Sequence, residues 1–364
     1  MHLRVSLLAI SAAAMAVSAG AAAAEDLHIY NWSDYIAEDT IAKFEAATGI
    51  NVTYDVFDSN EVLEAKMLAG ASGYDIVVPT NDFLQRQIAA GVYAKLDKSL
   101  LPNLKNLDAG MMQRAGASDP GGEHSVIYLW GTTGIGYNVD KVKERLGADA
   151  PVGSWDLVFK PENAAKLADC GISMLDAPTE IIAAAMNYIG LDPQSKDPAD
   201  IEAGAALLKT IQPYVRYFHS SQYINDLANG DVCVSIGWSG DIFQARDRAA
   251  EADNGNKIAY VIPAEGALMW FDNLAIPTDA PNPAAAHKFI NFIMDPQIAA
   301  DISNYVLYAN ANAASTPMID AEVTGDPGIY PTAAAKERLW TAVVYGSKTD
   351  RIVNRAWTDM KAGR

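Results

Sequence analysis

Four separated segments of this sequence place aromatic rings beside carboxylates or other hydrogen-bonding groups. The segments are YNWSDYI at 30–36, GWSGD at 237–241, GALMWFDNLAIP at 266–277 and YANAN at 308–312. An aromatic face attracts a cation by about 0.5 to 2 kcal/mol, and a carboxylate accepts charge-assisted hydrogen bonds from ammonium. A single tryptophan or aspartate more often fills a core or caps a helix, but the repetition over distant segments favours a site for an organic amine.

Two of these segments follow predicted strands, which is where a parallel α/β sheet binds its ligand. Trp32, Asp34 and Tyr35 of YNWSDYI lie just beyond the apolar run at 27–30, and GWSGD comes directly after the run at 232–236. The aromatic and acidic residues that stand out on the four segments are Trp32, Asp34, Tyr35, Trp238, Asp241, Trp270, Phe271, Asp272 and Tyr308.

The sequence gives no positive support for catalysis or for a bound metal. Its five histidines are scattered without the i, i+4 spacing that places two imidazoles on one helix face. No nucleophile elbow, phosphate-binding loop or calcium loop is present, and no nucleophile stands beside a recognisable base. We therefore expect no metal and no cofactor.

The glycine-rich segment GTTGIGYN at 131–138 follows an apolar strand at 126–130. A dinucleotide-binding loop is the alternative interpretation, but the third glycine of that motif is missing and no helix opens directly on the glycines. We interpret the segment as a crossover between two domains.

Length and charge restrict the class of protein. The chain has 364 residues, half of them apolar, which predicts a substantial core and two domains. Lys plus Arg number 27 and Asp plus Glu number 45, for a formal charge of −18. This charge argues against binding to nucleic acid or anionic lipid and favours a cationic partner, although acidity that serves only solubility is the alternative.

Residues 1–24 have the pattern of a secretory signal peptide. Their one charged residue, Arg4, precedes an apolar run, and the small residues Ala22 and Ala24 precede a predicted cut before Glu25. An uncleaved membrane anchor is the alternative, but the end of this segment is rich in Ala and Ser, and no second apolar run of about 18 residues follows. We expect a soluble protein exported to the periplasm.

Export also decides how the two cysteines are interpreted. An oxidising compartment favours a disulfide between Cys170 and Cys233, and two separate buried thiols are the alternative. Closing a loop of this size stabilises a fold by about 4 kcal/mol in the chain-entropy treatment. No CxxC motif indicates a redox or zinc site.

Apolar runs and amphipathic stretches alternate from residue 27, which predicts an α/β fold with a parallel sheet covered on both faces. The predicted elements of the first region are a strand at 27–30, a helix at 39–48 stopped by Gly49, a strand at 52–56, a helix capped by Ser59 that ends before Gly70, a strand at 75–78 and a helix at 81–90. A second α/β region runs from 138 to about 257. The strand at 257–262 is expected to return to the first domain, and helices at 283–294 and 296–306 follow it.

At YNWSDYI, DVFDSNEVLEAKMLAG (55–70) and YDIVVP (74–79), the sequence resembles the periplasmic polyamine-binding proteins of ABC importers. The likeness continues through GTTGIGYN, SWDLVFKPEN, YFHSSQYINDLANGDVCVSIGWSGDIFQA, YANAN and RAWTDMKAGR, and so spans essentially the whole chain after the leader. It implies the two-lobed periplasmic binding protein fold, with a ligand cleft between α/β lobes and closure about a hinge. It also implies the Cys170–Cys233 disulfide. The expected division is a signal peptide at 1–24, a first lobe of 25–131 plus 258–305 and a second lobe of 132–257 plus 306–364.

The resemblance carries the ligand contacts of the family onto particular positions. These contacts fall on Trp32, Ser33, Asp34, Tyr35, Glu180, Trp238, Asp241, Asp272 and Tyr308. The chain departs from the family at Thr80, where a serine is usual, and at Trp270, where a phenylalanine is usual, and we include both as ligand-binding residues. Asp82 either offers a further carboxylate to a longer amine or serves as a surface helix cap.

The hypothesis is therefore a periplasmic binding protein that captures a linear diamine, putrescine, and delivers it to the permease of an inner-membrane ABC transporter. Asp241, Asp272 and Glu180 are expected near the charged ends, with the aromatic rings covering the methylene chain. We expect a monomer that binds no nucleic acid. The alternatives are spermidine or agmatine as ligand, a polyamine sensor, and an exported hydrolase acting on amines or glycans with Asp34, Glu180 or Asp241 as acid and base.

Overall fold

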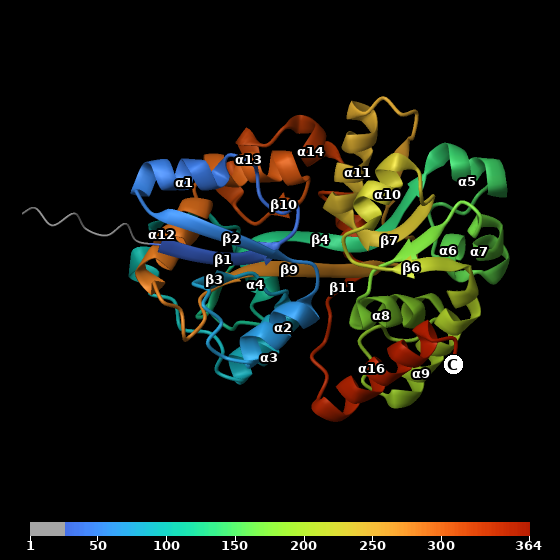
Figure 1. Cartoon of the computed structure of the whole chain (residues 1–364), viewed down its shortest axis with the longest axis horizontal. Helices are drawn as coiled ribbons and strands as arrows, with labels where there is room; N and C mark the ends of the chain where they lie inside the picture. Colours follow the sequence, from blue (N-terminus) through green and yellow to red (C-terminus); the bar gives the residue numbers. More distant parts are fainter. Residues whose placement is uncertain (1–25) are drawn as a thin grey trace, which may run out of the picture.

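The computed structural model describes residues 26–364, and the predicted signal peptide lies outside the described residues. The strands of this part of the chain form one sheet, whose central path runs β2-β1-β3-β9-β4-β7-β5-β6. Figure 1 shows helices on both faces of the sheet, grouped around its two halves. This is the expected α/β architecture with two lobes.

The first lobe is built on parallel strands, as the alternating pattern predicts. Strand β1 (Asp26–Trp32) lies between β2 (Asn51–Phe57) and β3 (Ile76–Val77), and pairs in parallel with both. The helices around this half are α1 (Thr40–Thr48), α2 (Asn60–Leu68), α3 (Asn81–Ala89), α4 (Ala109–Ala115), α12 (Pro283–Ile293) and α13 (Pro296–Val306), with short 3-10 turns η1 (Lys98–Leu100) and η2 (Pro102–Asn106).

The caps expected from the sequence are present at two of these helices. The Ser59 side chain accepts a hydrogen bond from the backbone N–H of Val62 and so caps α2. Helix α1 ends at Gly49, whose φ of 74° is the left-handed conformation that glycine adopts without steric cost. Both helices therefore begin and end within a residue or two of the predicted positions.

Two long strands pass from one lobe to the other. They are β4 (Ser125–Asn138) and β9 (Ala267–Ala275), which pair antiparallel with each other. The centre of the sheet is therefore antiparallel, whereas the strand-helix units at its edges have the parallel pairing that the sequence predicts. The GTTGIGYN segment continues β4 as a strand, and its Gly136 leaves room for the Ile242 side chain, which a Cβ there would approach to 2.4 Å.

The second lobe again has parallel strands at its outer edge. Strand β5 (Ile172–Met174) pairs in parallel with β6 (Val215–Phe218) and with β7 (Val234–Trp238), while β7 pairs antiparallel with β4. Its helices are α5 (Val139–Leu146), α6 (Asp156–Phe159), α7 (Pro161–Leu167), α8 (Pro178–Tyr188), α9 (Pro198–Ile211), α10 (Tyr223–Asn229) and α11 (Ser239–Glu251), with the turn η3 (Gln212–Tyr214). The Cys170–Cys233 disulfide is confirmed, and it joins the segments that lead into β5 and β7.

The chain leaves the second lobe later than the sequence predicts. Strand β8 (Ile258–Val261) pairs with β4 at residues 135–138, and Ile258 packs in the core of the second lobe. The half-buried Tyr260 and Val261 pack against the same core, so the return to the first lobe takes place through β9. Similarly, Tyr308 packs in the first-lobe core and β10 (Ala309–Asn310) pairs with β4, although residues from 306 onward were expected in the second lobe.

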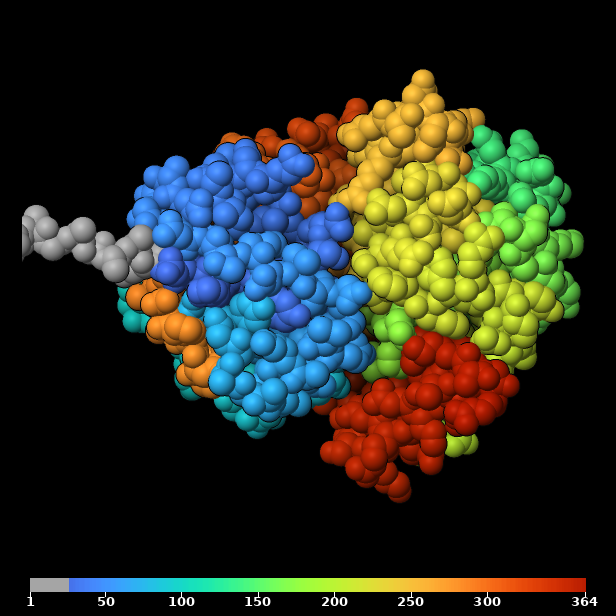
Figure 2. Space-filling view, in the orientation of Figure 1, coloured from blue at the N-terminus to red at the C-terminus, as the bar shows by residue number. Residues whose placement is uncertain are grey.

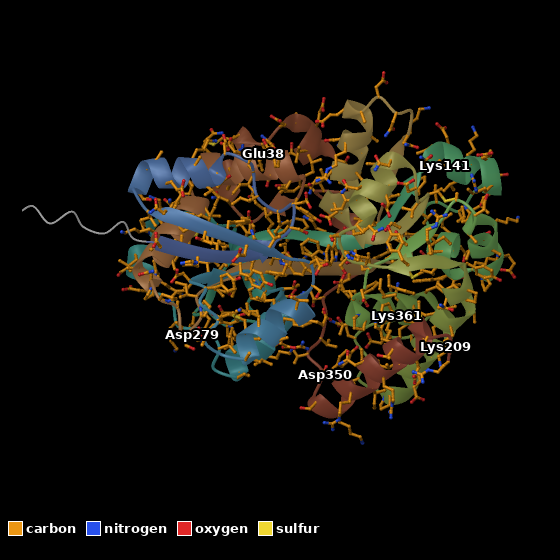
Figure 3. The ribbon with its side chains drawn as sticks, in the orientation of Figure 1. Glu38, Lys141, Lys209, Asp279, Asp350 and Lys361 are labelled. Carbon is orange, nitrogen blue, oxygen red and sulfur yellow. A yellow bond between two sulfur atoms is a disulfide. The ribbon has the colours of Figure 1, made fainter. Side chains whose placement is uncertain are left out.

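The C-terminal segment crosses between the lobes a third time. After η4 (Ala313–Met318), α14 (Ala321–Gly325) and α15 (Ala333–Lys336), strand β11 (Leu339–Trp340) pairs with β9, and helix α16 (Ser347–Lys361) then packs on α8 and α9. Figure 3 shows Asp350 and Lys361 at opposite ends of α16. Lys361 Nζ lies 2.7 Å from Asp176 of the second lobe, and Asp350 lies 4.0 Å from Arg86 of the first.

The buried apolar side chains form one cluster in each lobe and a third, smaller cluster between them. The third cluster contains Trp130 of β4, Phe271 of β9 and Phe243 of α11, so it lies against the crossing strands. Figure 2 shows the first lobe, in blue, meeting the yellow surface of the second along one seam. Within residues 26–364, no helix combines the length and the apolar character needed to cross a bilayer.

Candidate functional site

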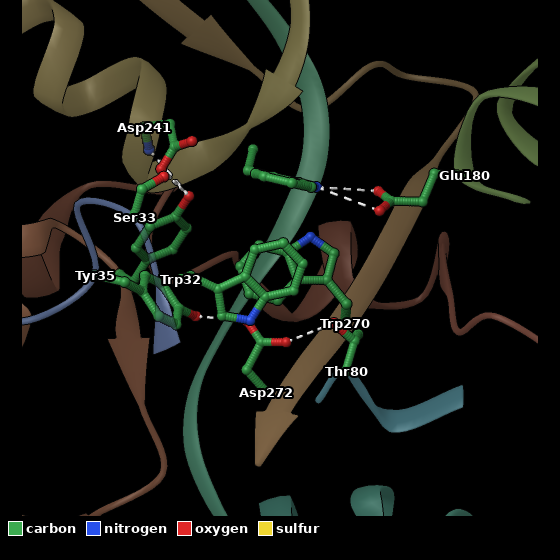
Figure 4. Close-up of a pocket in the computed structure, with 10 residues that line it drawn as sticks. Trp32, Ser33, Tyr35, Thr80, Glu180, Asp241, Trp270 and Asp272 are labelled. Atoms are coloured by element: carbon green, nitrogen blue, oxygen red, sulfur yellow. Dashed lines mark hydrogen bonds between the residues drawn. The ribbon is translucent and has the colours of Figure 1, made fainter. Parts of the chain in front are cut away.

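A cavity of about 380 Å³ lies at the junction of the two lobes. The side chains that line it are aromatic, acidic or hydroxyl-bearing: Trp32, Ser33, Tyr35, Thr80, Glu180, Trp238, Asp241, Trp270, Asp272 and Tyr308. The structure thus brings together ten of the eleven residues that the sequence analysis selected as ligand-binding. Figure 4 shows Asp241 and Glu180 on opposite sides of this group, with Trp32 and Trp270 between them.

Two tryptophans, one from each lobe, meet at the cavity. The rings of Trp32 and Trp238 are T-shaped, with centroids 5.2 Å apart and planes at 78°. The indole N–H of Trp32 donates to the carbonyl of Val78 at 2.9 Å, which holds this ring to its own lobe. The indole N–H of Trp238 instead points to Glu180, with a nitrogen–oxygen distance of 3.2 Å. These rings supply the apolar, quadrupolar walls that a methylene chain and an ammonium group require.

Asp272, on the crossing strand β9, is the carboxyl group that faces the first lobe. Tyr35 and Thr80 donate hydrogen bonds to its two oxygens, at 2.8 and 2.7 Å. The Asn60 side chain in turn donates to the Thr80 hydroxyl at 2.8 Å, which fixes that hydroxyl. Burial raises the pKa of Asp272 to about 7, and the two hydrogen bonds act in the opposite direction.

Asp241 lies in the first turn of α11 and belongs to the second lobe. Tyr223 donates to one of its oxygens at 2.6 Å and Tyr308 donates to the other at 2.7 Å. Burial raises the pKa of Asp241 to about 7, against the effect of both hydroxyl donors. Its position at a helix N-terminus also favours the charged form.

Glu180 lies in the first turn of α8, on the far side of the tryptophan pair. Its carboxylate accepts hydrogen bonds from the Thr133 hydroxyl at 2.5 Å and from the Trp238 indole. Burial raises the pKa of Glu180 to about 8. The residues that line the cavity thus include two buried carboxyl groups, Asp241 and Asp272, and the half-buried Glu180. Among the described residues, no basic side chain lines it.

Asp34 lies outside the cavity. Its backbone φ is 54°, and its exposed carboxylate forms an ion pair with Arg248 of α11, with a nitrogen–oxygen distance of 2.6 Å. The Gln244 side chain donates to the Asp34 carbonyl at 3.2 Å. Asp34 therefore contacts the opposite lobe at the rim of the cleft, and its carboxylate faces away from the cavity.

Asp82 and Trp270 are both buried. Asp82 is 5% exposed in the first turn of α3, so it is not a surface cap, and it does not line the cavity. Its charge nevertheless contributes to raising the pKa of Asp272 and of Glu180. Trp270 does line the cavity and packs edge-on against Tyr308, with centroids 5.4 Å apart. Its buried indole N–H has no hydrogen-bond partner within residues 26–364.

Three supporting residues were not selected from the sequence. Tyr223, Thr133 and Asn60 do not line the cavity, but each donates a hydrogen bond to a carboxylate or hydroxyl that does. Thr133 lies in GTTGIGYN and Tyr223 in the long block at 217–245, yet nothing in their spacing marks them out. Their role depends on contacts between segments far apart in the chain.

A second, smaller cavity adjoins the first behind the tryptophan pair. It measures about 230 Å³ and shares Trp32, Trp238 and Glu180 with its neighbour. It adds the carboxyl group of Glu61, whose pKa burial raises to about 7. Within the described part of the chain, no three His, Cys, Asp or Glu side chains are grouped so that they could hold a metal ion.

Comparison with known proteins identifies the family. The sequence profile of the bacterial extracellular solute-binding proteins matches residues 39–332. The chain is 55% identical to the putrescine-binding periplasmic protein PotF of Escherichia coli (strain K12), over 98% of this chain and 97% of that protein. It is also 55% identical to the putrescine-binding periplasmic protein SpuD of Pseudomonas aeruginosa (strain UCBPP-PA14), over 98% of each chain.

Solved structures support the same assignment. The spermidine/putrescine ABC transporter substrate-binding protein PotD of Streptococcus pneumoniae superposes with a TM-score of 0.74 at 27% identity, over 93% of this chain and 99% of that one. This chain therefore belongs to the bacterial extracellular solute-binding protein family. It has the two-lobed fold of periplasmic binding proteins, and it is a binding protein rather than an enzyme.

Proposed function

We propose that this protein binds putrescine in the cavity between its lobes and delivers it to the permease of an ABC importer. The observation that carries the proposal is the cavity itself, in which two buried carboxyl groups and one half-buried carboxyl group lie among aromatic rings without a countercharge from the lining residues. A buried charge without a partner is strongly unfavourable, so the site is suited to a ligand that brings positive charge. A diamine brings two such charges joined by an apolar chain.

The arrangement of the acids fits the two ends of such a ligand. Asp241 and Asp272 lie near one another, since the charge of Asp241 contributes to raising the pKa of Asp272, while Glu180 lies beyond the aromatic rings. In the proposed complex, one ammonium group is held near the aspartates and the other near Glu180. The rings of Trp32, Trp270 and their neighbours cover the methylene groups between them.

We propose that the ten lining residues are the ligand contacts and that Asp34 acts at the rim. Because the lining comes from both lobes, a ligand that touches both binds the closed form more tightly and shifts the population toward it. Asp34 and Arg248 join the lobes only when these approach, so their ion pair favours the same closed form.

Location and partners belong to the same proposal. The relatives PotF and SpuD are periplasmic, and the leader at 1–24 has the pattern that directs a chain across the inner membrane. We propose that the mature protein is a periplasmic monomer that presents its closed form to inner-membrane permease subunits. Its net negative charge supports the absence of nucleic acid among its ligands.

A longer amine is the second candidate ligand. The adjoining cavity of about 230 Å³ lies directly behind Glu180 and adds the Glu61 carboxyl group. A third amino group on a spermidine-like chain would reach a carboxylate there, whereas putrescine would leave that cavity to water. Thermal-shift competition among putrescine, agmatine and spermidine separates the candidates, because the ligand with the highest affinity raises the unfolding temperature most at equal concentration.

Titration calorimetry with putrescine tests the proposal directly. We expect saturable binding by the wild type at one site per chain, and a loss of about a hundredfold or more in Asp272→Ala, which removes a buried charge partner. Asp149→Ala, at an exposed position outside the cavity, is the matched control and should bind as the wild type does. Undiminished affinity in Asp272→Ala would refute the electrostatic basis of the site.

A further inference from the structure

Tyr223 lies behind the proposed ligand site, and its ring does not line the cavity. It is the first residue of α10, and its side chain is fully buried in the core of the second lobe. Its hydroxyl accepts a hydrogen bond from the backbone N–H of Trp238 at 3.1 Å and lies 2.6 Å from an oxygen of Asp241. The one hydroxyl thus contacts two residues that form the cavity wall.

The direction of these two hydrogen bonds is fixed by chemistry. A backbone N–H can only donate, so the bond from Trp238 occupies a lone pair of the Tyr223 oxygen. The single hydroxyl proton is then directed to Asp241. A donor held in this way stabilises the charged carboxylate over the neutral acid, and it also fixes where the carboxylate points.

A second tyrosine makes the same pair of hydrogen bonds at the other oxygen of Asp241. The Tyr308 hydroxyl accepts from the backbone N–H of Asp241 at 3.1 Å and donates to its carboxylate at 2.7 Å. Asp241 is therefore held by two tyrosines from different elements, and each hydroxyl is oriented by a backbone donor. Only Tyr308 also lines the cavity.

The two glycines of GWSGD make room for these two rings. A Cβ on Gly237 would come within 2.5 Å of the Tyr223 ring, and a Cβ on Gly240 would come within 2.4 Å of the Tyr308 ring. Distances below 3.0 Å are not tolerated by a rigid, buried ring. The glycines, the tryptophan and the aspartate of this segment thus form one unit with the tyrosines.

We propose that Tyr223 is a positioning residue for the ligand: it favours the charged form of the Asp241 carboxyl group, directs this group into the cavity, and fixes the Trp238 backbone beside it. This assignment rests on the proposed function of the cavity. It gives the buried hydroxyl of Tyr223 a role in affinity although it does not touch the ligand.

Other charged and titratable groups around Asp241 come from several elements, and a test must hold them constant. They are Asp34 and Tyr35 after β1, Asp272 on β9, Tyr308 after α13, and Arg248 on α11 itself. Asp34 and Arg248 form an ion pair with each other. Replacing the Tyr223 hydroxyl alone leaves all of these groups in place.

The experiment compares Tyr223→Phe with the wild type in two measurements. The first is a ¹³C-carboxyl NMR titration of the ligand-free protein, with the Asp241 signal assigned by its absence in Asp241→Asn. Losing a hydrogen bond to the charged form should move its midpoint upward by about one pH unit. The second is calorimetry with putrescine, in which the affinity should fall by about tenfold near neutral pH and recover partly as the pH rises above the new midpoint.

Tyr217→Phe is the matched control, because Tyr217 donates an equivalent 2.6 Å hydrogen bond to Asp226 of α10, away from the cavity. It should change neither the Asp241 midpoint nor the putrescine affinity. In a protein that already carries Asp241→Asn, adding Tyr223→Phe should reduce the putrescine affinity little further. The Tyr223 hydroxyl is proposed to affect affinity only by its hydrogen bond to the Asp241 carboxylate.

The outcomes separate this assignment from the proposed function. If the titration midpoint of Asp241 is higher in the ligand-free Tyr223→Phe protein than in the wild type, the assignment is supported. This holds even if the wild type binds no putrescine, a result by which the proposed function would fail. If the wild type binds putrescine and Tyr223→Phe leaves both the midpoint and the affinity unchanged, the assignment is overturned. A loss of affinity that is the same at every pH also overturns it, since simple loosening of the fold would produce that result.

Discussion

One strand in each lobe ends at the cleft with a tryptophan that is followed by a serine. The aspartates that come next in the two segments point in different directions. In the first lobe, Trp32 is followed by a turn in which Asp34 points outward to Arg248. In the second lobe, Trp238 is followed directly by α11, in whose first turn Asp241 points inward. The third residue after the tryptophan lines the cavity in both segments, and it is Tyr35 in one and Asp241 in the other.

The difference shows that the backbone after the strand decides the role of the acid. A left-handed residue in a turn directs the Asp34 side chain to the rim, where water and Arg248 solvate it. The first helical turn instead directs Asp241 into the cavity, where it is buried and needs hydroxyl donors and a cationic ligand. The buried acid should therefore control affinity, and the exposed acid should only adjust it.

Removing the buried acid should have the largest effect. We expect Asp241→Ala to weaken putrescine binding by about a hundredfold or more, because the ammonium group loses a desolvated partner. Calorimetry at constant pH measures this loss, with circular dichroism to verify folding. A loss similar to that of Asp34→Ala would remove the distinction between the two segments.

The pH dependence should be the next largest effect. Burial raises the pKa of Asp241 and Asp272 to about 7 and that of Glu180 to about 8, all above the unfolded value near 4. The ligand-free fold therefore binds more protons than the unfolded chain, and these groups should lower its stability as the pH rises from about 4 to about 8. A bound diamine favours the charged acids, so its affinity should rise over the upper part of this range, by up to about tenfold per pH unit for each proton released.

Thermal unfolding at several pH values, with and without putrescine, measures this linkage. The stabilisation by the ligand should be larger at pH 8 than at pH 6. Replacing Asp241 and Asp272 together by asparagine should flatten the dependence. A stabilisation by putrescine that does not change between these pH values would contradict the raised pKa values.

The two tryptophans should respond differently to the loss of their indole N–H groups. Trp238→Phe removes a donor to Glu180 and should weaken putrescine binding by about tenfold, a usual value for a hydrogen bond to a charged group. Trp32→Phe removes a donor to the Val78 carbonyl and should instead lower the free energy of unfolding, by about 1 to 3 kcal/mol. Measuring putrescine affinity and the free energy of unfolding for both variants tests this difference. It would be contradicted if the two variants lost the same affinity and the same stability.

The smallest effect is expected at the rim. Asp34→Asn removes an ion pair between partly exposed side chains and should reduce putrescine affinity by no more than about fivefold. The difference from the wild type should diminish in high salt, which screens exposed charges. A loss of a hundredfold would place Asp34 in contact with the ligand.

Much of the site could be predicted because its chemistry is local. Trp32, Trp238 and Asp272 were identified from aromatic and acidic residues that follow strands or interrupt apolar runs, and the structure places all three at one cavity. The helix bounds were predictable for the same reason, since the Ser59 cap and the Gly49 stop act within a few residues. The position of β8 could not be predicted, because apolar alternation does not say which core a strand covers.

The sequence by itself determined the types of groups in the cavity, the alternation of strands and helices, and the separate apolar cores, because periodicity and capping are properties of neighbouring residues. Only the tertiary structure decided that Asp34 faces solvent while Asp241 is buried, and that Tyr223 supports the latter. These outcomes depend on contacts between segments 18 to 214 residues apart. Burial and hydrogen-bond direction arise only when such segments meet, so no local pattern encodes them.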